Sequence, residues 1–444
     1  MKVLMCRSCG SARLQVVLDL GDHPVSNALL TRDPLRQEEK RYPLAVLFCT
    51  DCALLQVGET IPPDALYQRD YPYYSSSSPA LLEHAAAIAE RLIHERRLGP
   101  QSWVIEVASN DGYLLRNFLS HGVPCLGIDP AVGPSERANA IGVPTINAFF
   151  GSRMAAQLAE AGHRADVMIA NNVVAHVDAI NDFVAGFARL LKPDGIAVFE
   201  FAYAVEMIEA CEFDTIYHEH LFYHTLHGIT PLFARHLLHV NDVERLPIHG
   251  GSLRLFVSPR PGTSGRLEEL LDHERRLGVH LVSYYRGFSE RVLTLKHALQ
   301  ALLRHEKERA KRIVCYGAAA KGSTLVNYLD LGSGFFDYVV DANPHKQGKF
   351  MPGQRIPIYP PSRLVEDQPD YVLLLVWNFA GEVLQQQAAY RRAGGRFIVP
   401  IPTPRVIEPD EVVGDTVFAL CHAPSERHAP PLQAVGGIER RLAE

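Results

Sequence analysis

Five side chains suited to acid–base chemistry crowd into the segment between residues 214 and 224: Tyr217, His218, Glu219, His220 and His224. Imidazole has the unperturbed pKa nearest neutral pH, so proteins that remove and return protons gather histidine with carboxylate or phenol partners. In a helix, Tyr217, His220 and His224 would share one face; in an extended segment, His218 and His220 would face opposite to Tyr217 and Glu219. The segment predicts proton transfer, against the alternative of a polar surface turn.

A second candidate group follows a strand predicted over Trp103 to Val107. The chain then turns through Glu106-Val-Ala-Ser-Asn-Asp-Gly112, and the next predicted strand ends at Asp129. Ligands of doubly wound sheets bind at the carboxyl ends of the strands, where small residues allow close approach and Asp129 can take ribose hydroxyls. GxGxxG is absent, which disfavours a dinucleotide. An acidic turn suits a ligand with a sulfonium and an ammonium group, so we expect S-adenosylmethionine, held by Glu106, Ala108, Asn110, Asp111, Gly112, Asp129, Asn171 and Asn172.

His176 follows the strand predicted over Asp166 to Asn171, and therefore lies at the same rim as the acidic turn. Asn171 and Asn172 can hydrogen-bond a cofactor, and His176 can touch a substrate. The alternative for His176 is a helix cap or a surface role.

Two further turns could contact phosphate. His249-Gly-Gly-Ser-Leu-Arg254 predicts a hairpin, and the functional alternative adds His249 or Arg254 as a phosphate contact. Gly317-Ala-Ala-Ala-Lys321-Gly-Ser-Thr opens a predicted helix, whose N-terminus together with Lys321 suits a pyrophosphate. The order of Lys321 and Gly322 does not fit the spacing of a P-loop, so ATP is not expected.

Four cysteines form two CxxC pairs: Cys6, Cys9, Cys49 and Cys52. Two such CxxC knuckles supply four thiolates that can bind one metal ion in tetrahedral geometry, which is typical of a structural zinc ribbon. The alternatives are two unrelated pairs or a redox motif, but no βαβ pattern surrounds either pair. A closed four-sulfur site has no open coordination position, so we assign Zn²⁺ to folding and not to chemistry.

The remaining pattern predicts an α/β protein of several domains. Residues 1–70 form the zinc module; residues 71–260 alternate strands and helices and predict a parallel, doubly wound sheet. Residues 261–420 begin with long linking helices and continue with a smaller α/β domain. The last segment, 421–444, is rich in proline, charge and glycine and is expected to be disordered.

Bulk properties limit the partners. The chain has 444 residues, 47% of them hydrophobic, and a formal net charge of −6, so no basic field exists to attract nucleic acid or an anionic membrane. The N-terminus lacks the pattern of a secretory leader, and no apolar run has the length of about 18 residues expected of a membrane span. We expect a cytoplasmic protein; monomer and homodimer stay open.

Together, the four cysteines, the Glu106 to Gly112 turn, the Asn171 to Val177 stretch, Tyr-His-Glu-His220 and the turn ending at Arg254 resemble the nucleotide-sugar C-methyltransferases of deoxysugar biosynthesis. The resemblance runs from Cys6 to about Pro402. It implies an N-terminal zinc module, a class I methyltransferase domain with a Rossmann-like fold, and a C-terminal Rossmann-like domain without a redox cofactor.

The resemblance also implies the reaction, which is methylation at C-3 of a dTDP-4-keto-6-deoxysugar by S-adenosylmethionine. His220 aligns with the catalytic base, and Tyr217 and Glu219 are its partners. His176 and one tyrosine among Tyr71, Tyr73 and Tyr74 align with residues of the sugar pocket. Three alternatives stay open: an enzyme that C-methylates another carbon acid, a non-catalytic zinc-ribbon adaptor, and a nucleic-acid methyltransferase. The net negative charge of the chain disfavours the last of these.

Overall fold

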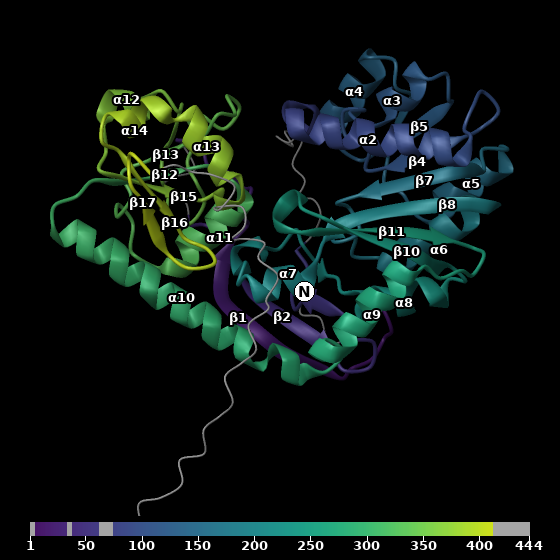
Figure 1. Ribbon diagram of the computed structural model, residues 1–444, viewed down its shortest axis with the longest axis horizontal. Helices are drawn as coiled ribbons and strands as arrows, with labels where there is room; N and C mark the ends of the chain where they lie inside the picture. Colours follow the sequence, from purple (N-terminus) through teal and green to yellow (C-terminus); the bar gives the residue numbers. More distant parts are fainter. Residues whose placement is uncertain (1–4, 33–37, 62–73, 412–444) are drawn as a thin grey trace, which may run out of the picture.

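The computed structural model describes residues 5–32, 38–61 and 74–411. Three sheets organise this part of the chain, with the largest at the right of Figure 1, the C-terminal one at the left, and β1 and β2 beneath them. The predicted α/β class, with two Rossmann-like sheets after an N-terminal module, is confirmed. The expected disordered tail and the tyrosines Tyr71 and Tyr73 lie outside the described residues.

The N-terminal sheet is antiparallel and contains one strand from far along the chain. Its order is β1 (Leu14–Pro24), β2 (Arg41–Cys49), β3 (Leu55–Val57) and β9 (Phe222–Tyr223). Leu55 of β3 lies opposite Tyr223 of β9. The zinc module is therefore completed by the end of the acid–base segment, a pairing that local sequence patterns do not encode.

The middle sheet has seven strands in the order β10-β11-β8-β7-β4-β5-β6. Strands β4 to β8 are parallel and β10 and β11 form an antiparallel edge. The bounds are β4 (Val104–Val107), β5 (Cys125–Asp129), β6 (Thr145–Asn147), β7 (Ala165–Asn171), β8 (Leu191–Ala202), β10 (His239–Leu246) and β11 (Ser252–Ser258). Chain order reverses between β4 and β7, which is where such sheets bind ligands.

Helices and 3-10 turns surround this sheet. They are η2 (Ser75–Ser77), α2 (Pro79–Arg96), α3 (Leu115–Ser120), α4 (Val132–Ala140), α5 (Ser152–Glu160), α6 (Ile180–Leu190), α7 (Ala204–Glu209), η3 (Phe213–Thr215), α8 (Leu226–Arg235) and η4 (Ile248–Gly250). Ser78 caps α2, because its hydroxyl accepts the Leu81 N–H and Pro79 opens the helix. The apolar stripe of α2 then packs on the sheet.

The predicted linking helices are α9 (Gly265–Leu277) and α10 (Val282–Glu308). They lead to a six-stranded sheet in the order β14-β13-β12-β15-β16-β17, parallel except for β17. The elements are β12 (Ile313–Tyr316), α11 (Ala320–Leu329), β13 (Val339–Val340), β14 (Ile358–Tyr359), α12 (Arg363–Asp367), β15 (Tyr371–Leu374), η5 (Trp377–Phe379), α13 (Ala380–Gln386), α14 (Ala388–Arg392), β16 (Arg396–Val399) and β17 (Arg405–Ile407).

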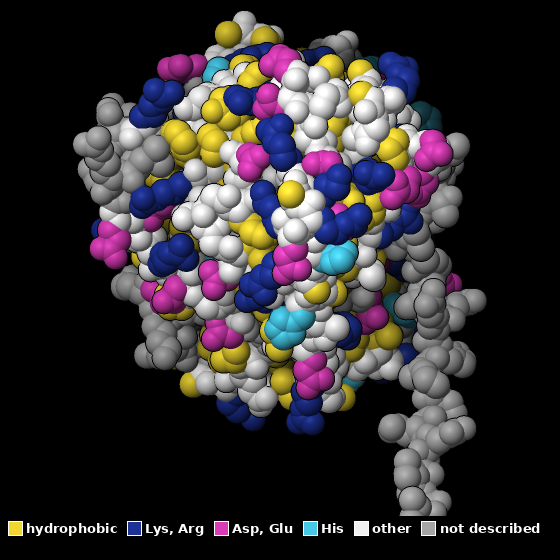
Figure 2. Space-filling model, turned by 90° about the vertical axis from the view of Figure 1, so that its left-hand side faces the viewer, with side chains coloured by type: hydrophobic (Ala, Val, Ile, Leu, Met, Phe, Trp, Pro, Cys, Tyr) yellow, Lys and Arg dark blue, Asp and Glu magenta, His cyan; other side chains and the backbone are white. Residues whose placement is uncertain are grey.

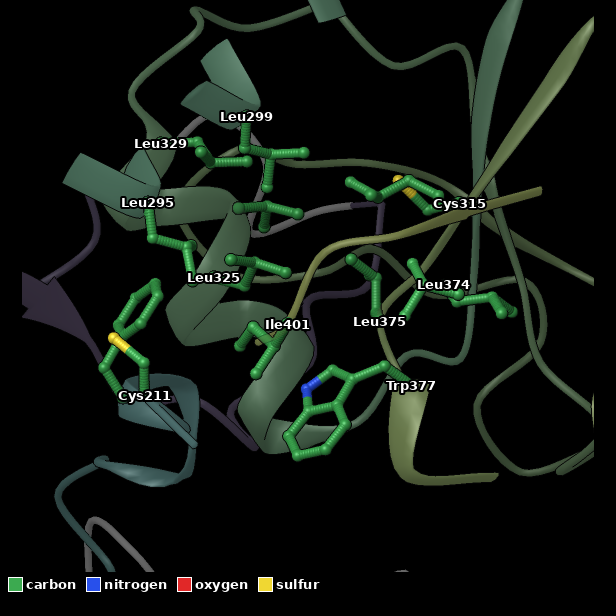
Figure 3. Packing of buried hydrophobic residues seen from close by; sticks show 14 of the residues in the cluster. Cys211, Leu295, Leu299, Cys315, Leu325, Leu329, Leu374, Leu375, Trp377 and Ile401 are labelled. Carbon is green, nitrogen blue, oxygen red and sulfur yellow. The ribbon is translucent and has the colours of Figure 1, made fainter. Parts of the chain in front are cut away.

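One hydrophobic core joins the C-terminal domain to the N-terminal sheet through α10. Figure 3 shows Leu295 and Leu299 of α10 beside Leu325 and Leu329 of α11, with Cys211 at the edge of the cluster. Leu44 and Val46 of the N-terminal sheet belong to the same core. The modules are thus packed together and are not joined only by linkers.

One side of the molecule, at the left of Figure 1, carries charged side chains of both signs. Figure 2 shows lysine and arginine side chains interspersed with aspartate and glutamate over this face. Within the described ranges, no helix combines the length and the apolar content that crossing a bilayer requires.

Candidate active site

The acid–base segment is neither helical nor extended at its centre. It is a β-turn in which the His220 N–H donates to the Tyr217 carbonyl at 2.9 Å. The Tyr217 hydroxyl lies 2.7 Å from Nε2 of His220, and Nδ1 of His220 lies 3.0 Å from the Thr215 carbonyl oxygen. Because a carbonyl only accepts, Nδ1 carries the proton and Nε2 holds the lone pair. In its neutral form, His220 is therefore a base whose basic nitrogen faces the Tyr217 hydroxyl.

Burial divides the cluster in two. Tyr217 and His220 are half-buried, whereas His218, Glu219 and His224 are buried. His218 points to the N-terminal module, where its Nε2 lies 3.2 Å from the Pro43 carbonyl, and burial lowers its pKa. His224 packs between aromatic rings. The turn matches neither the helical nor the extended alternative; His220 has the Tyr217 hydroxyl at a ring nitrogen, whereas His218 contacts a carbonyl of the N-terminal module.

His176 lies beside His220. A second turn, closed by the His176 N–H and the Val173 carbonyl at 2.8 Å, is tied to the first by the Leu221 N–H and the Ala175 carbonyl at 2.7 Å. The His176 and His220 rings meet edge to face with centroids 4.8 Å apart. Burial lowers the pKa of His176 to about 4, although a hydrogen bond with the Glu219 carbonyl acts in the opposite direction and raises it. His176 is thus a neutral donor or acceptor beside the base.

Glu219 has a partner that the sequence did not suggest. Asn27 Nδ2 donates to Glu219 Oε1 at 2.7 Å, across 192 positions of sequence. Burial raises the pKa of Glu219 to about 7, and the Asn27 bond opposes that rise. Both nitrogens of His220 are taken by Thr215 and Tyr217, so the Glu219 carboxylate does not bond this imidazole, and its role as a partner of the base stays a prediction. No motif around Asn27 could have identified it.

The acidic turn after β4 has a strained backbone. Ala108, Asn110 and Gly112 have positive φ values of 59°, 49° and 77°. A Cβ on Gly112 would lie 3.0 Å from the Val143 side chain, so both conformation and space require glycine there. The Asn110 N–H donates to Asp129 at 2.8 Å and joins the turn to the end of β5. Such strain clusters at ligand sites.

The turn also has an electrostatic character that suits a cation. Glu106 is buried, and its pKa is raised well above the usual range by burial and by the nearby Asp129 and Asp111. Burial likewise raises the pKa of Asp129. Glu106 Oε2, Ser109 Oγ and Asn171 Oδ1 are buried without a hydrogen-bond partner in the described part of the chain. Acidic and unsatisfied polar groups at one rim fit a cationic, hydrogen-bonding cofactor.

Three other predicted cofactor residues have partners within the chain. The Asn110 side chain accepts the Ser75 N–H at 2.8 Å, and Asp111 accepts both the N–H and the hydroxyl of Ser76. These two side chains fasten the start of α2 over the acidic turn. The Asn172 N–H donates to the Glu200 carbonyl at 2.6 Å, with φ of 53° at Asn172. Direct cofactor contacts by these residues stay predictions.

Arg254 does not point to an open phosphate site. Its guanidinium donates to Glu200 at 2.9 Å, lies 3.5 Å from Glu244, and contacts His84 on α2 at 3.0 Å. The expected phosphate contact is therefore corrected to a buried ion pair that joins three strands and a helix. The side chain of His249, the alternative contact, lies outside the described side chains.

Of the three candidate tyrosines, only Tyr74 lies in the described ranges. The Arg137 guanidinium of α4 lies 5.6 Å from the centre of the Tyr74 ring. A Cβ on Gly133 of α4 would come within 2.7 Å of the Tyr74 hydroxyl. Tyr74 therefore packs on α4, and its role in a sugar pocket stays a prediction.

Lys321 begins α11 and faces the segment before the base. Its Nζ donates to Asn378 at 2.9 Å and lies 4.2 Å from the centre of the Trp377 ring. The Trp377 indole N–H donates to buried Asp214 at 2.7 Å. Burial raises the pKa of Glu212 to about 8 and that of Asp214 to about 6, while Lys321 opposes both shifts. Lys321 thus links the C-terminal domain electrostatically to the acid–base segment.

The four predicted zinc ligands come together. Their sulfur atoms all lie within 4.8 Å of one another, with Cys6 and Cys52 3.5 Å apart and Cys9 and Cys49 3.6 Å apart. A tetrahedron with Zn–S bonds of about 2.3 Å has sulfur separations of about 3.8 Å, so the residues fit zinc. The second knuckle immediately precedes β3, which pairs with β9.

Comparison with known proteins covers all three modules. Residues 6–67 match a family model described as "Putative zinc binding domain", residues 77–238 match "Methyltransferase domain", and residues 247–402 match "C-methyltransferase C-terminal domain". The C-methyltransferase NovU of Streptomyces niveus is 34% identical over 415 residues, which are 92% of this chain and 98% of NovU.

Two solved structures are similar to part of the chain. Magnesium protoporphyrin IX methyltransferase (ChlM) from Synechocystis PCC 6803 with bound SAM is 13% identical, covers 40% of this chain and 78% of its own, and gives a TM-score of 0.31. The PH0226 protein from Pyrococcus horikoshii OT3 is 15% identical, covers 44% of this chain and 98% of its own, and gives a TM-score of 0.33.

Proposed function

Because this chain belongs to the C-methyltransferase family, we propose that it methylates C-3 of a nucleotide-linked 4-keto-6-deoxysugar with S-adenosylmethionine. The observation that carries the proposal is the pairing of Tyr217 with His220, whose Nδ1 donates to the Thr215 carbonyl and leaves Nε2 as the basic nitrogen of the neutral ring. A base and a hydroxyl donor so close together suit removal of a proton from the carbon beside a ketone.

The reaction proceeds through an enolate. His220 Nε2 takes the C-3 proton, and the electron pair of the C–H bond passes into the enolate, whose oxygen accepts a hydrogen bond from the Tyr217 hydroxyl. S-adenosylmethionine, when bound, supplies an electrophilic methyl group on a sulfonium. The carbanion forms the new carbon–carbon bond in line, while the electrons of the carbon–sulfur bond stay on sulfur.

His176 completes this arrangement. Its ring meets that of His220 edge to face, and its low pKa keeps it neutral at physiological pH. A neutral imidazole beside the base avoids the repulsion that a second cation would impose when His220 gains its proton. His176 is placed to hydrogen-bond the sugar, as the family resemblance implies.

The cofactor is held at the rim of β4, β5 and β7. Glu106 would offer negative charge to the cationic cofactor, and Asp129 would take its ribose hydroxyls. The unpartnered Asn171 Oδ1 accepts from the cofactor's polar groups. Zn²⁺ has a structural role because its four sulfur ligands close the site.

The sugar nucleotide lies between this rim and the C-terminal domain. Lys321 at the N-terminus of α11 contacts the pyrophosphate, and the side chain reaches toward Asp214 and Glu212 just before the base. A dTDP-sugar is the expected substrate from the family resemblance.

The test is a product analysis with S-adenosylmethionine and a dTDP-4-keto-2,6-dideoxyhexose. We expect methyl transfer, with NMR placing the new methyl group on C-3, and loss of that product in His220→Asn. Methyl transfer to a different carbon acid but not to this sugar would support the alternative substrate class. Binding of S-adenosylmethionine with no methyl transfer to any ketone would support the alternative that the protein is a non-catalytic zinc-ribbon adaptor.

A further inference from the structure

The zinc module contacts the acid–base segment at several points. Nε2–H of His218 donates to the Pro43 carbonyl at 3.2 Å, and the Val57 N–H donates to the Leu221 carbonyl at 2.9 Å. β3 then pairs with β9. These contacts hold the acid–base segment in place on both sides of Glu219, whose side chain is only 3% exposed.

A short turn after β1 brings the zinc module to Glu219. The Ala28 N–H donates to the Val25 carbonyl at 3.1 Å, and this turn presents Ser26 and Asn27 in different directions. Ser26 lies 3.5 Å from Thr324 of α11, whereas Asn27 donates to the Glu219 carboxylate at 2.7 Å. Thr324 donates in turn to the Ile216 carbonyl at 3.0 Å. All three modules thus meet at the segment that carries the base.

We propose that Asn27 is a positioning residue of the active site, which fixes the Glu219 carboxylate and so the turn that presents Tyr217 and His220. This inference rests on the proposed function. Glu219 is the link because its carboxylate is held by Asn27 while its backbone carbonyl bonds His176. The N-terminal module therefore shapes the catalytic centre through a side chain, in addition to supporting it through strands.

The charge state of Glu219 gives the proposal a measurable signature. A donated hydrogen bond favours the carboxylate, so removing it raises the pKa above its value of about 7. Titratable side chains near Glu219 include Tyr217, His218 and His220 of its own segment, His176, which bonds its carbonyl, and His23 of β1, which interacts with His218. Burial and Asn27 are the two influences on Glu219 itself.

The first experiment compares full-length, zinc-loaded Asn27→Leu, Asn27→Gln and Ser26→Ala. Ser26→Ala is the matched control, because it alters the same turn but not the bond to Glu219. We expect Asn27→Leu to lower kcat about tenfold or more at neutral pH, with little change in KM for S-adenosylmethionine. The acid limb of its kcat profile should move to higher pH, and Asn27→Gln, which keeps an amide donor, should recover part of the loss.

An unchanged pH profile in Asn27→Leu, even with lower thermal stability, would overturn the proposal and leave only a structural role for Asn27. The proposed function would survive that result, because wild-type methyl transfer is measured separately.

A second measurement does not depend on turnover. Carboxyl ¹³C NMR of glutamate-labelled protein, with the Glu219 signal assigned from Glu219→Gln, follows the titration directly. Asn27→Leu should raise the pKa of Glu219 by about 1 or more, and Ser26→Ala should leave it in place. An unmoved titration would overturn the proposal whether or not the sugar is the substrate. Should Asn27→Leu fail to fold, Asn27→Ser serves in both measurements.

Discussion

The Tyr217 hydroxyl lies 2.7 Å from Nε2 of His220, the ring nitrogen that the Thr215 carbonyl on Nδ1 leaves basic. Main-chain geometry thus selects the tautomer, and a single β-turn supplies both the base and the hydroxyl donor. No equivalent arrangement surrounds His218 in the described structure, where Nε2 faces a main-chain carbonyl and the ring is buried.

Removal of the base should abolish turnover without loss of cofactor binding. We expect His220→Asn to lower kcat about a hundredfold or more, and Tyr217→Phe to lower it less because the base remains. His345→Asn, at an exposed histidine of the C-terminal domain, is the control and should behave as wild type. Steady-state kinetics together with calorimetric binding of S-adenosylmethionine provide the measurement; wild-type turnover in His220→Asn would rule out its role.

Cofactor binding should release protons. The pKa values of Glu106 and Asp129 are raised by burial, and a bound cation would lower them, so at any pH where these carboxyls titrate, binding should displace protons. Affinity for S-adenosylmethionine should therefore increase as pH rises, until these carboxyls are ionised in the free protein. Calorimetry in two buffers of different ionisation enthalpy measures the proton count. We expect Glu106→Gln to weaken binding and reduce the release; proton uptake by the wild type would contradict the assignment.

Local patterns in the sequence predicted the strands and the turn that form the cofactor rim. Each depends on neighbours along the chain: β5 is predicted to end at Asp129, and it does. The small residues between Val107 and Tyr113 predicted a turn. The structure has such a turn, and its backbone adopts positive φ values. The α/β class followed from the alternation of such segments.

Contacts between distant segments could not be predicted in this way. The Asn27 bond to Glu219 spans 192 positions, and neither residue type requires the other. Likewise, the local sequence around Arg254 suggested a phosphate contact. The pairing of distant strands instead brings its guanidinium to Glu200. The family resemblance assigns the base to His220, and the structure adds the burial and hydrogen-bond partners that distinguish the two histidines of this turn.

The buried pair of Glu200 and Arg254 should stabilise the cofactor domain. Glu200 is 1% exposed, and although burial raises its pKa, the bonds from His84 and Arg254 outweigh burial and lower it. Since the folded pKa lies below the unfolded value of about 4.3, this stabilisation is present above that pH and is lost as pH falls through the folded pKa. Glu200→Gln should cost about 2 kcal/mol or more at neutral pH.

Chemical denaturation at neutral and acid pH measures this effect. The difference between Glu200→Gln and wild type should shrink as pH falls. Arg275→Ala removes an exposed pair with Asp272 and should change stability little. A neutral effect of Glu200→Gln at pH 7 would contradict the stabilising role.

Zinc removal should disable the active site through β3 and β9. Cys52→Ser should lower zinc content, thermal stability and turnover together, because the second knuckle leads into the strand that pairs with the acid–base segment. Metal analysis and circular dichroism are the readouts. Cys125→Ala, at a buried cysteine outside the metal cluster, should keep its zinc. Full turnover in a zinc-free protein would refute the link.

The central claim is that His220 removes the proton from the carbon beside the sugar ketone. Incubation of wild type and His220→Asn with a dTDP-4-keto-2,6-dideoxyhexose in deuterated water, with S-adenosylhomocysteine in place of the methyl donor, isolates that step. Mass spectrometry and NMR should find deuterium at C-3 with the wild type and almost none with His220→Asn. Equal deuterium exchange by both proteins would contradict the account. It would also be contradicted if the wild type showed no exchange but methylated the sugar normally when S-adenosylmethionine was present.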